Sequence, residues 1–318
     1  MPLFSPAADC WYLTGPTACG KTAVGVELAR RLDAEIVSLD SMAVYRGMDI
    51  GTAKPTPAEQ GGVPHHLLDV IDPNEQYSLA QYVEAAHRVI GEIRSRDREV
   101  LFVGGTPLYL KALLRGIFEG PPADWEFRRA VESELEQVGQ QALHDRLAQV
   151  DPLSADKLHP NDTKRIIRAL EVFKLTGEPI SHLQEQFETA RPADECRVFV
   201  LQWSRAELHR RIEQRVDEMF ERGLIDEARG VVERYGELSR TACQALGYRE
   251  VLEHVDGGGD MAETIEQVKV RTRQFARRQL TWFRGLSECR DVPMEGETDS
   301  PSDASEIAER IVAMADCS

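Results

Sequence analysis

Hydrophobic positions in the first part of the chain follow two alternating patterns. Short runs rich in apolar residues predict strands at 10–13, 35–39 and 100–103. Apolar residues that recur every three or four positions predict helices over 21–32, 78–96 and 107–115. The spacing of Ser78 and Gln81 is that of a capping box at the start of the second helix. Strands that alternate with helices in this way indicate a parallel α/β sheet.

The pattern changes after Pro121-Pro122, where the apolar periodicity becomes helical up to residue 186. A strand pattern returns only at 198–201. We therefore expect an all-helical domain over 120–196, inserted into a sheet domain formed by 1–119 plus 197–318.

The last part of the chain is predicted to contain two long helices. One starts with a capping box at Ser204 and stops at Gly223, and the other covers 261–284. The Pro/Ser/acidic stretch 293–305 is expected to be a mobile connection.

A phosphate-binding loop of the G-x-x-x-x-G-K-[ST] type lies between the first predicted strand and its helix. Its residues are Gly15, Pro16, Thr17, Ala18, Cys19, Gly20, Lys21 and Thr22. Backbone N–H groups and the helix N-terminus bind phosphate here, Lys21 adds a positive charge, and the Thr22 hydroxyl can bind magnesium. The fold is therefore expected to be a P-loop NTPase-like parallel sheet flanked by helices, and the ligand a di- or triphosphate.

One carboxylate follows a predicted strand of this sheet. The strand at 100–103 leads into Gly104-Gly105-Thr106 without an acidic residue, whereas the strand at 35–39 ends at Asp40. Ligands of open α/β sheets bind at the carboxyl ends of the strands. Asp40 is thus a candidate magnesium ligand or general base, and a cap of the following turn is the structural alternative.

Composition and charge narrow the class of protein. The chain has 42% hydrophobic and 29% charged residues, and no apolar run approaches the ~20 residues of a membrane span. The first nine residues do not form a signal peptide, and six scattered cysteines lack zinc-site spacing, so we expect a cytoplasmic protein.

The net charge of −16 argues against a generally nucleic-acid-binding surface. Basic residues nevertheless gather at Lys164, Arg165 and Arg168 and along 261–284. A solvated basic face and an RNA-backbone contact both explain such clusters, and Arg168 could instead form an internal ion pair with Glu171, three residues further on.

Together these motifs resemble the tRNA dimethylallyltransferase family, also called tRNA isopentenyltransferases. Besides the phosphate-binding loop, the resemblance rests on 40–46, 49–55, 65–69, 103–106, 161–162, 165–172, 247–250 and 272–279. Three positions depart from the common pattern, namely Cys19 where Ser is common, Ala43 where Gln is frequent, and Arg277 where Lys is frequent.

The resemblance implies transfer of a dimethylallyl group from dimethylallyl diphosphate to N6 of adenosine 37, beside the tRNA anticodon. Asp40 would be the general base, and Thr106 would contact the substrate near the reacting atoms. The phosphate-binding loop and Arg215 would bind the diphosphate with Mg²⁺. Expected partners are the diphosphate and the tRNA anticodon stem-loop, bound by a monomer that does not associate with membranes. The residues expected to contact tRNA are Asp40, Ser41, Met42, Ala43, Thr106, Arg128, Lys164, Arg165, Ile166, Ile167, Arg168, Gln244, Ala245, Leu246, Gly247, Tyr248 and Arg249.

Three other functions remain open at the level of sequence. An adenylate isopentenyltransferase would perform the same chemistry on a free nucleotide, although AMP requires no inserted domain. A small-molecule kinase would need a carboxylate after a second strand and an arginine-rich lid. A nucleotide-gated RNA-binding switch would exchange or hydrolyse nucleotide without prenyl transfer.

Overall fold

The computed structural model describes residues 5–118, 120–184, 190–258, 260–295 and 302–316. The chain divides into two compact units, each described here by itself. The smaller unit comprises Met1–Ser5 and Arg115–Thr189, and the larger comprises Pro6–Leu114 and Ala190–Ser318. The helical insertion expected from the sequence was 120–196.

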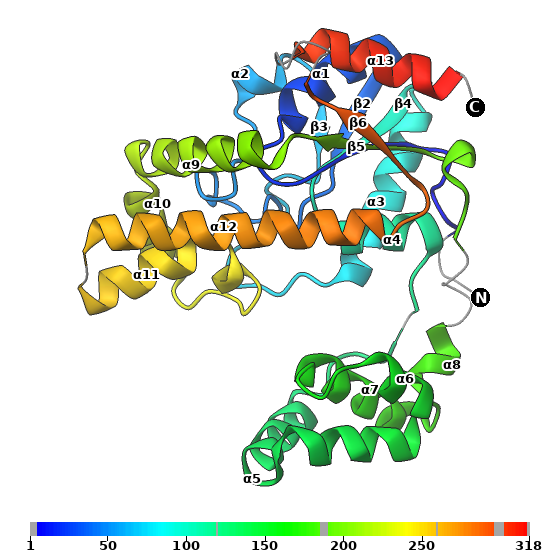
Figure 1. The fold of residues 1–318 in the computed structure, drawn as a ribbon, viewed down its shortest axis with the longest axis vertical. Coiled ribbons are helices and arrows are strands. Elements are labelled where there is room, and N and C mark those ends of the chain that lie inside the picture. The colour runs from blue at the N-terminus through cyan, green and yellow to red at the C-terminus, as the bar shows by residue number, and fades with distance from the viewer. Residues whose placement is uncertain (1–4, 119, 185–189, 259, 296–301, 317–318) are drawn as a thin grey trace. The chain divides into compact units, whose positions relative to one another are not determined.

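The larger unit is built on a six-stranded parallel sheet (Figure 1). Its strands are β1 (Trp11–Thr14), β2 (Ala34–Ser38), β3 (His65–His66), β4 (Glu99–Val103), β5 (Arg197–Gln202) and β6 (Cys289–Pro293). Their spatial order is β3-β2-β4-β1-β5-β6. The loops after β2, β4 and β1 therefore follow adjacent strands at one edge of the sheet.

Helices cover both faces of this sheet (Figure 1). Those before the insertion are α1 (Lys21–Leu32), α2 (Pro57–Gln60), α3 (Leu79–Arg94) and α4 (Pro107–Arg115). Those after it are α9 (Arg205–Glu221), α10 (Leu224–Tyr235), α11 (Tyr248–Gly257), α12 (Met261–Arg284) and α13 (Ala304–Asp316), with short 3-10 turns η2 (Ala193–Glu195) and η3 (Ala242–Gln244). Helix α1 packs against α13, and α12 packs against α9.

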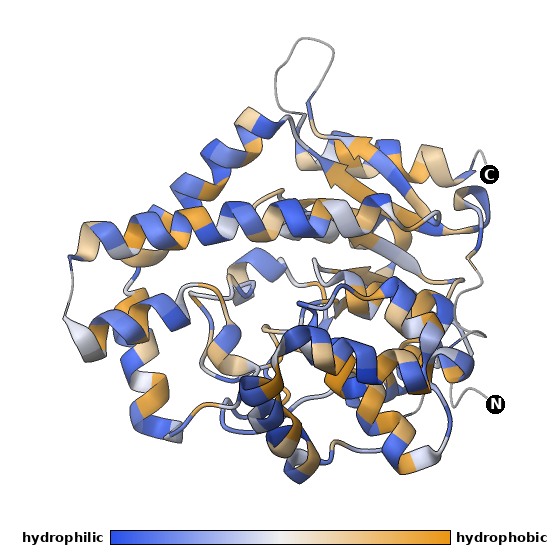
Figure 2. Ribbon diagram, turned by 60° about the horizontal axis from the view of Figure 1, so that its bottom comes forward, coloured by the Kyte–Doolittle hydropathy of each residue, from blue (hydrophilic) through white to orange (hydrophobic). Residues whose placement is uncertain are grey.

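Strands β1, β2, β4 and β5 are mostly buried, as in a sheet with two helical layers, whereas β3 and β6 at the sheet edges are partly exposed. Trp11 and Leu13 of β1 belong to the core that α1 and α13 complete. Tyr12 points to the opposite face, where its ring stacks on Phe102 with centroids 5.0 Å apart. The strands are accordingly mostly hydrophobic in Figure 2, whereas the helices carry one hydrophobic and one hydrophilic side.

A second core lies away from the sheet. Val44, Tyr45 and Met48, in the segment that follows Asp40, pack with Leu224 of α10 and Tyr248 of α11. This core fixes the far end of the loop after β2 against α10 and α11.

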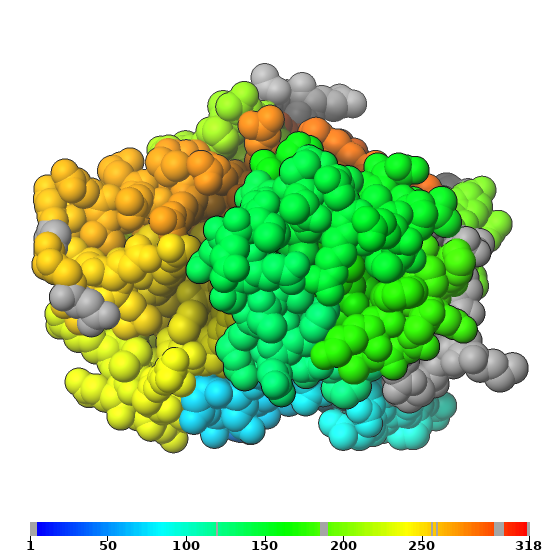
Figure 3. Space-filling view, turned by 90° about the horizontal axis from the view of Figure 1, so that it is seen from below, coloured from blue at the N-terminus to red at the C-terminus, as the bar shows by residue number. Residues whose placement is uncertain are grey.

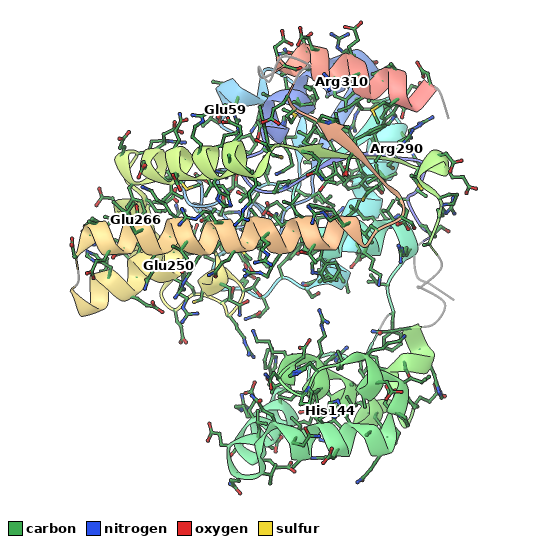
Figure 4. The ribbon with its side chains drawn as sticks, viewed as in Figure 1. Glu59, His144, Glu250, Glu266, Arg290 and Arg310 are labelled. Carbon is green, nitrogen blue, oxygen red and sulfur yellow. The ribbon has the colours of Figure 1, made fainter. Side chains whose placement is uncertain are left out.

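The smaller unit is helical, with α5 (Trp125–Val150), α6 (Pro152–Lys157), α7 (Thr163–Thr176) and α8 (Ile180–Gln184). Its core includes Val131, Leu143 and Leu147 of α5 and Ile166 and Leu170 of α7. Helix α5 is interrupted at Gly139, which has φ 81°. After this break, His144 (Figure 4) bonds the carbonyls of Ala155 and Leu158 at 3.0 and 2.9 Å and holds α6 against α5.

Most of the elements predicted from the sequence are confirmed, including the bounds of α1, α4 and α12 and the capping box at Ser78. One detail at α9 was wrong. The Ser204 hydroxyl caps the amide of Glu207, but the Glu207 side chain binds Arg210 and does not complete a capping box. The predicted stop is confirmed, because the helix ends at Glu221 and Gly223 follows with φ 94°, where it also precedes the start of α10.

Strand β6 and helix α13 were missed, and they include both ends of the stretch predicted to be mobile. Residues 296–301 of that stretch lie outside the described residues. Among the described helices, none is long and apolar enough to cross a membrane.

Candidate functional site

The phosphate-binding loop connects β1 to α1 as the sequence predicted. Gly20 precedes the helix with φ 94°, a left-handed conformation that glycine adopts without strain. The Lys21 ammonium donates to the carbonyls of Gly15 and Pro16 at 3.1 and 2.7 Å. Thr22 occupies the second position of α1, where backbone N–H groups lack intrahelical partners and can bind an anion.

Donors from α9 and from the turn after β5 hold the next carbonyls of this loop. Arg211 donates to the carbonyl of Ala18 at 2.9 Å, and the Trp203 indole donates to that of Cys19 at 3.0 Å. The Arg211 guanidinium also lies 4.8 Å from the centroid of the Trp203 ring. These contacts use carbonyl oxygens, so they leave the N–H groups at the start of α1 for a phosphate.

Thr17 is held by two side chains that lie far from it in sequence. Arg215 of α9 donates to the Thr17 hydroxyl at 3.2 Å, and the Gln279 amide oxygen of α12 accepts the Thr17 N–H at 2.9 Å. Removal from water lowers the pKa of Arg215, and the negative charge of Asp40 acts in the opposite direction. Arg215 therefore lies within electrostatic reach of both the loop and Asp40.

Asp40 and Thr106 lie at the same edge, on the loops after β2 and β4. The Thr106 hydroxyl oxygen accepts the Ser41 N–H at 3.1 Å, and the Thr106 N–H donates to the carbonyl of Leu39 at 3.1 Å. Asp40 Oδ1 accepts the N–H groups of Met42 and Ala43 at 2.8 and 3.2 Å. Asp40 is thus a turn cap through one oxygen, and Oδ2 receives no hydrogen bond from a described residue.

The aromatic pair Tyr82 and Tyr109 lies near Asp40. Their rings stack with centroids 3.9 Å apart, and Tyr82 donates to the carbonyl of Ser38 at 2.9 Å. Burial raises the pKa of both hydroxyls, and the charge of Asp40 adds to this effect. Both tyrosines therefore stay neutral beside the carboxylate.

Glu227 of α10 anchors the loop after β2 at its far end. Its two carboxylate oxygens accept the N–H groups of Asp49, Ile50 and Gly51 at 2.7–3.0 Å, and the Tyr248 hydroxyl donates to the same carboxylate. This carboxylate joins the segment 49–51 to α10 and to the first residue of α11.

Lys54 closes the same loop on itself. Its buried ammonium donates to the Tyr45 carbonyl at 2.8 Å and pairs with Asp49 and Asp69 at 2.5 and 2.6 Å.

In the smaller unit, two candidate tRNA contacts share one buried carboxylate. Arg128 donates to Glu171 through Nε and Nη2 at 2.8 and 2.7 Å, and Arg168 forms an ion pair with the same group. The Glu171 side chain is 0% exposed. Removal from water raises its pKa, but the bonds from Arg128 and Arg168 outweigh this and hold the pKa below the ordinary value of 4.5. Both arginines therefore stabilise this unit internally.

The other candidates on α7 separate into exposed and buried residues. Lys164 and Arg165 are exposed, and Arg165 makes only a 3.4 Å pair with Asp162. Ile166 and Ile167, which the sequence analysis included among the expected tRNA contacts, have side chains buried in the helical core. An RNA contact through α7 therefore depends on its charged residues.

The candidate tRNA contacts in the segment 244–249 also include both exposed and buried residues. Gln244 and Arg249 are exposed, whereas Ala245 and Tyr248 are buried in the core shared with α10. The surface next to this segment is continuous between α11, in yellow, and the start of α12, in orange (Figure 3). Glu250 of α11 (Figure 4) pairs there with Arg271 of α12.

Some basic residues of α12 form ion pairs with neighbouring helices, and others are exposed to solvent. Lys269 and Arg273 pair with Asp217 and Glu213 of α9, each at 2.8 Å. Arg277, Arg278 and Arg284 are exposed, and none forms an ion pair with a described residue. The exposed positive charge of α12 thus gathers in its last two turns.

Sequence reasoning missed Gln279, Arg211, Trp203 and Glu227. Arg211 was detectable, because it lies four residues before Arg215 and so shares its side of the helix. Gln279 ends the segment 272–279 on which the resemblance rests, but the local pattern does not indicate its contacts. The contacts of Trp203 and Glu227 likewise join distant segments of the chain.

Comparison with known proteins agrees with this geometry. A family model described as IPP transferase matches residues 43–286. A tRNA dimethylallyltransferase of Rhodopirellula baltica is 48% identical over 98% of this chain and 94% of its own, and one of Geobacter metallireducens is 46% identical over 90% and 93%. The crystal structure of a tRNA isopentenylpyrophosphate transferase from Bacillus halodurans matches with a TM-score of 0.67 and 40% identity over 96% of each chain. A eukaryotic dimethylallyltransferase acting on tRNA matches with a TM-score of 0.72 and 28% identity over 89% of this chain and 73% of its own. The chain therefore belongs to the tRNA dimethylallyltransferase (IPP transferase) family.

Proposed function

We propose that this protein transfers the dimethylallyl group of dimethylallyl diphosphate to N6 of adenosine 37 in tRNA, with release of diphosphate. Family membership supports the reaction class, since the relatives are named tRNA dimethylallyltransferases. The observation that carries the assignment of roles is the placement of Asp40 and Thr106 beside the phosphate-binding loop. All three follow adjacent parallel strands, β2, β4 and β1.

The phosphate-binding loop would hold the leaving group. Lys21 and Arg215 place two positive charges at this loop, and the first N–H groups of α1 add hydrogen-bond donors. As the C–O bond to the diphosphate breaks, negative charge grows on the bridging oxygen. These donors stabilise the transition state because they are already in place when that charge develops.

Asp40 would accept the proton that N6 loses as it attacks the dimethylallyl carbon. Its Oδ1 is fixed by the turn that it caps, which orients the carboxylate and leaves Oδ2 for the substrate. Thr106 holds the Ser41 amide and so fixes the same turn from the neighbouring strand. General-base catalysis of this kind contributes about 10²- to 10⁴-fold.

The donors at this edge fit a magnesium ion that is held mainly by the substrate. Mg²⁺ is usually bound through one or two carboxylates together with substrate phosphates and water. The described residues contain no group of three or more His, Cys, Asp or Glu side chains arranged for a metal. The Thr22 hydroxyl would be the protein ligand, and the bound ion would neutralise charge on the diphosphate.

We favour tRNA over a free nucleotide as the acceptor because of the smaller unit. Its α7 presents Lys164 and Arg165 to solvent, where they can bind a polynucleotide backbone. An adenosine that is stacked between its neighbours in the tRNA cannot reach an active site, so the target base would be flipped out of the stack. A cytoplasmic, monomeric enzyme stays our expectation.

A transfer assay tests this function. The protein is mixed with labelled dimethylallyl diphosphate, Mg²⁺, and either unmodified tRNA or AMP. Label in tRNA, located at adenosine 37 by nuclease mapping, is the expected result. Label in AMP alone would identify an adenylate isopentenyltransferase. Label in neither acceptor, together with hydrolysis of ATP or GTP in a separate assay, would identify a nucleotide-gated switch.

A further inference from the structure

We infer that Gln279 is a positioning residue for prenyl transfer, because its amide fixes the separation between the diphosphate-binding loop and the loop that carries Thr106. This inference rests on the proposed function. Gln279 belongs to α12, is 4% exposed, and touches both loops at once. It lies 262 residues from Thr17 and 174 from Gly105.

The two contacts of Gln279 require both ends of a carboxamide. Its Oε1 accepts the Thr17 N–H at 2.9 Å, and its Nε2 donates to the Gly105 carbonyl at 2.5 Å. A carboxylate can only accept, and an apolar side chain can do neither. The Gln279 amide satisfies a donor on one loop and an acceptor on the other, which neither of these side chains can do.

Each loop carries one half of the proposed chemistry. Thr17 belongs to the phosphate-binding loop, and its hydroxyl is bound by Arg215. Gly105 precedes Thr106, whose hydroxyl holds the amide next to Asp40. The Gln279 amide therefore links the two sides of the site. It binds Thr17 on the side of the leaving group and Gly105, next to Thr106, on the side that accepts the proton.

The absence of a side chain at Gly105 makes room for this link. A Cβ there would lie 2.6 Å from Gln279 Nε2, a distance that forces the amide to move. The same Cβ would lie 3.2 Å from the Gly15 carbonyl and 3.5 Å from the Lys21 ammonium. Gly105 has no positive φ, so alanine can adopt its backbone conformation and will disturb chiefly these contacts.

The test measures single-turnover transfer at saturating dimethylallyl diphosphate and tRNA. Gln279→Met should lower the rate on the order of 10- to 100-fold, since small displacements of reacting groups have effects of this size. Its tRNA affinity should stay within about twofold of wild type, because the residue is buried. The matched control is Gln274→Met, an exposed glutamine on the same helix, which should transfer at the wild-type rate.

The pH dependence of Gln279→Glu distinguishes a positioning role from a purely structural one. When the Glu carboxyl is ionised, one of its oxygens faces the Gly105 carbonyl oxygen, and both atoms are acceptors. When the carboxyl is protonated, it can donate a hydrogen bond to that carbonyl as the amide does. The rate of this variant relative to wild type should therefore rise as pH falls. A ratio that does not change with pH would overturn the inference.

Gly105→Ala tests the link from its other end, with Gln279 itself intact. It should slow transfer in the wild-type background but cost little in a Gln279→Ala background, because the amide that it displaces is already gone. Additive losses, or a Gln279→Met rate equal to that of Gln274→Met, would overturn the inference. If wild type and Gln274→Met both fail to label tRNA, the proposed function fails and this inference with it.

Discussion

Arg168 of α7 forms an ion pair with Glu171, three residues further along the same helix. The Arg168 guanidinium also donates to the carbonyl of Pro121 at 3.0 Å. A residue that looked like an RNA contact is therefore part of the packing of the helical unit. Lys164 and Arg165, one turn earlier, remain exposed. The two groups of residues should respond differently to substitution.

The double variant Lys164→Ala/Arg165→Ala should weaken tRNA binding and flatten its salt dependence. Each phosphate contact contributes ~0.7–0.9 to the slope of log affinity against log salt. Loss of two contacts should lower the slope by about 1.4–1.8. Filter binding at several salt concentrations measures this slope, and a melting curve serves as the folding control. An unchanged slope would show that these side chains are merely solvated.

The helical unit should lose stability in acid through Glu171. Its folded-state pKa lies below the ordinary 4.5, so the ion pairs stabilise fully above that pH. The stabilisation is lost as pH falls through the lower, folded-state pKa. Urea unfolding of the full chain between about pH 3 and pH 6 measures this dependence.

A Glu171→Gln variant should be less stable at neutral pH and should lose less stability on acidification. Glu178→Gln on the exposed end of the same region is the matched control, because it removes the same charge without a buried partner. Equal pH profiles for the two variants would contradict a special role for Glu171.

Asp40→Asn should lower single-turnover transfer by about 10²- to 10⁴-fold. The asparagine oxygen can still accept the N–H groups of Met42 and Ala43, so the turn should be preserved. The amide cannot take up a proton from N6. Affinities for inorganic pyrophosphate and tRNA should stay close to wild type. A variant that transfers at nearly the wild-type rate would leave Asp40 with its capping role alone.

Lys21→Ala should weaken binding of dimethylallyl diphosphate while tRNA binding stays unchanged. A hydrogen bond to a charged group is worth about 1.5–3 kcal/mol, which corresponds to a loss of roughly 10- to 100-fold in affinity. Competition with inorganic pyrophosphate measures the first quantity and filter binding the second. A parallel loss of tRNA affinity would show that the two substrates share this lysine.

Glu227→Gln should destabilise the loop after β2. Both oxygens of Glu227 accept hydrogen bonds, so an amide NH₂ would face a backbone N–H on one side or the other. We expect a loss of ~1–3 kcal/mol in the free energy of unfolding. Glu233→Gln, exposed on the same helix, is the control. Equal melting temperatures for both variants would show that the loop does not depend on this carboxylate.

The sheet and its main helices were predictable because their signals are local. Helix α1 begins directly after a glycine-rich loop, and α12 begins after a run of glycines. The residues next to each helix therefore indicate where it starts. Strand β6 was missed because only Val292 of its five residues is buried. At the edge of a sheet such a strand is held by backbone pairing with β5, and its sequence need not look apolar.

The candidate site was predictable in its residues but not in its contacts. Asp40 and Thr106 follow strands, and Lys21 starts a helix, that the periodicity already placed. The partners of Thr17 come from α9 and α12 and depend on how these helices pack. For Arg168, the spacing of three residues to Glu171 on α7 offered an internal ion pair as the alternative to an RNA contact, whereas its bond to the Pro121 carbonyl depends on the fold.

The contact between Thr17 and Gln279 has a consequence for synthesis of the chain. The two residues are separated by 262 positions, and ribosomes add about 5–20 residues per second. Thr17 is therefore synthesised about 13–50 s before Gln279. Strand β1 likewise waits for β5, its neighbour on one side. A truncated chain that stops before α12 keeps Trp203, Arg211 and Arg215 but lacks the Gln279 amide that accepts the Thr17 N–H, so premature termination products should transfer poorly.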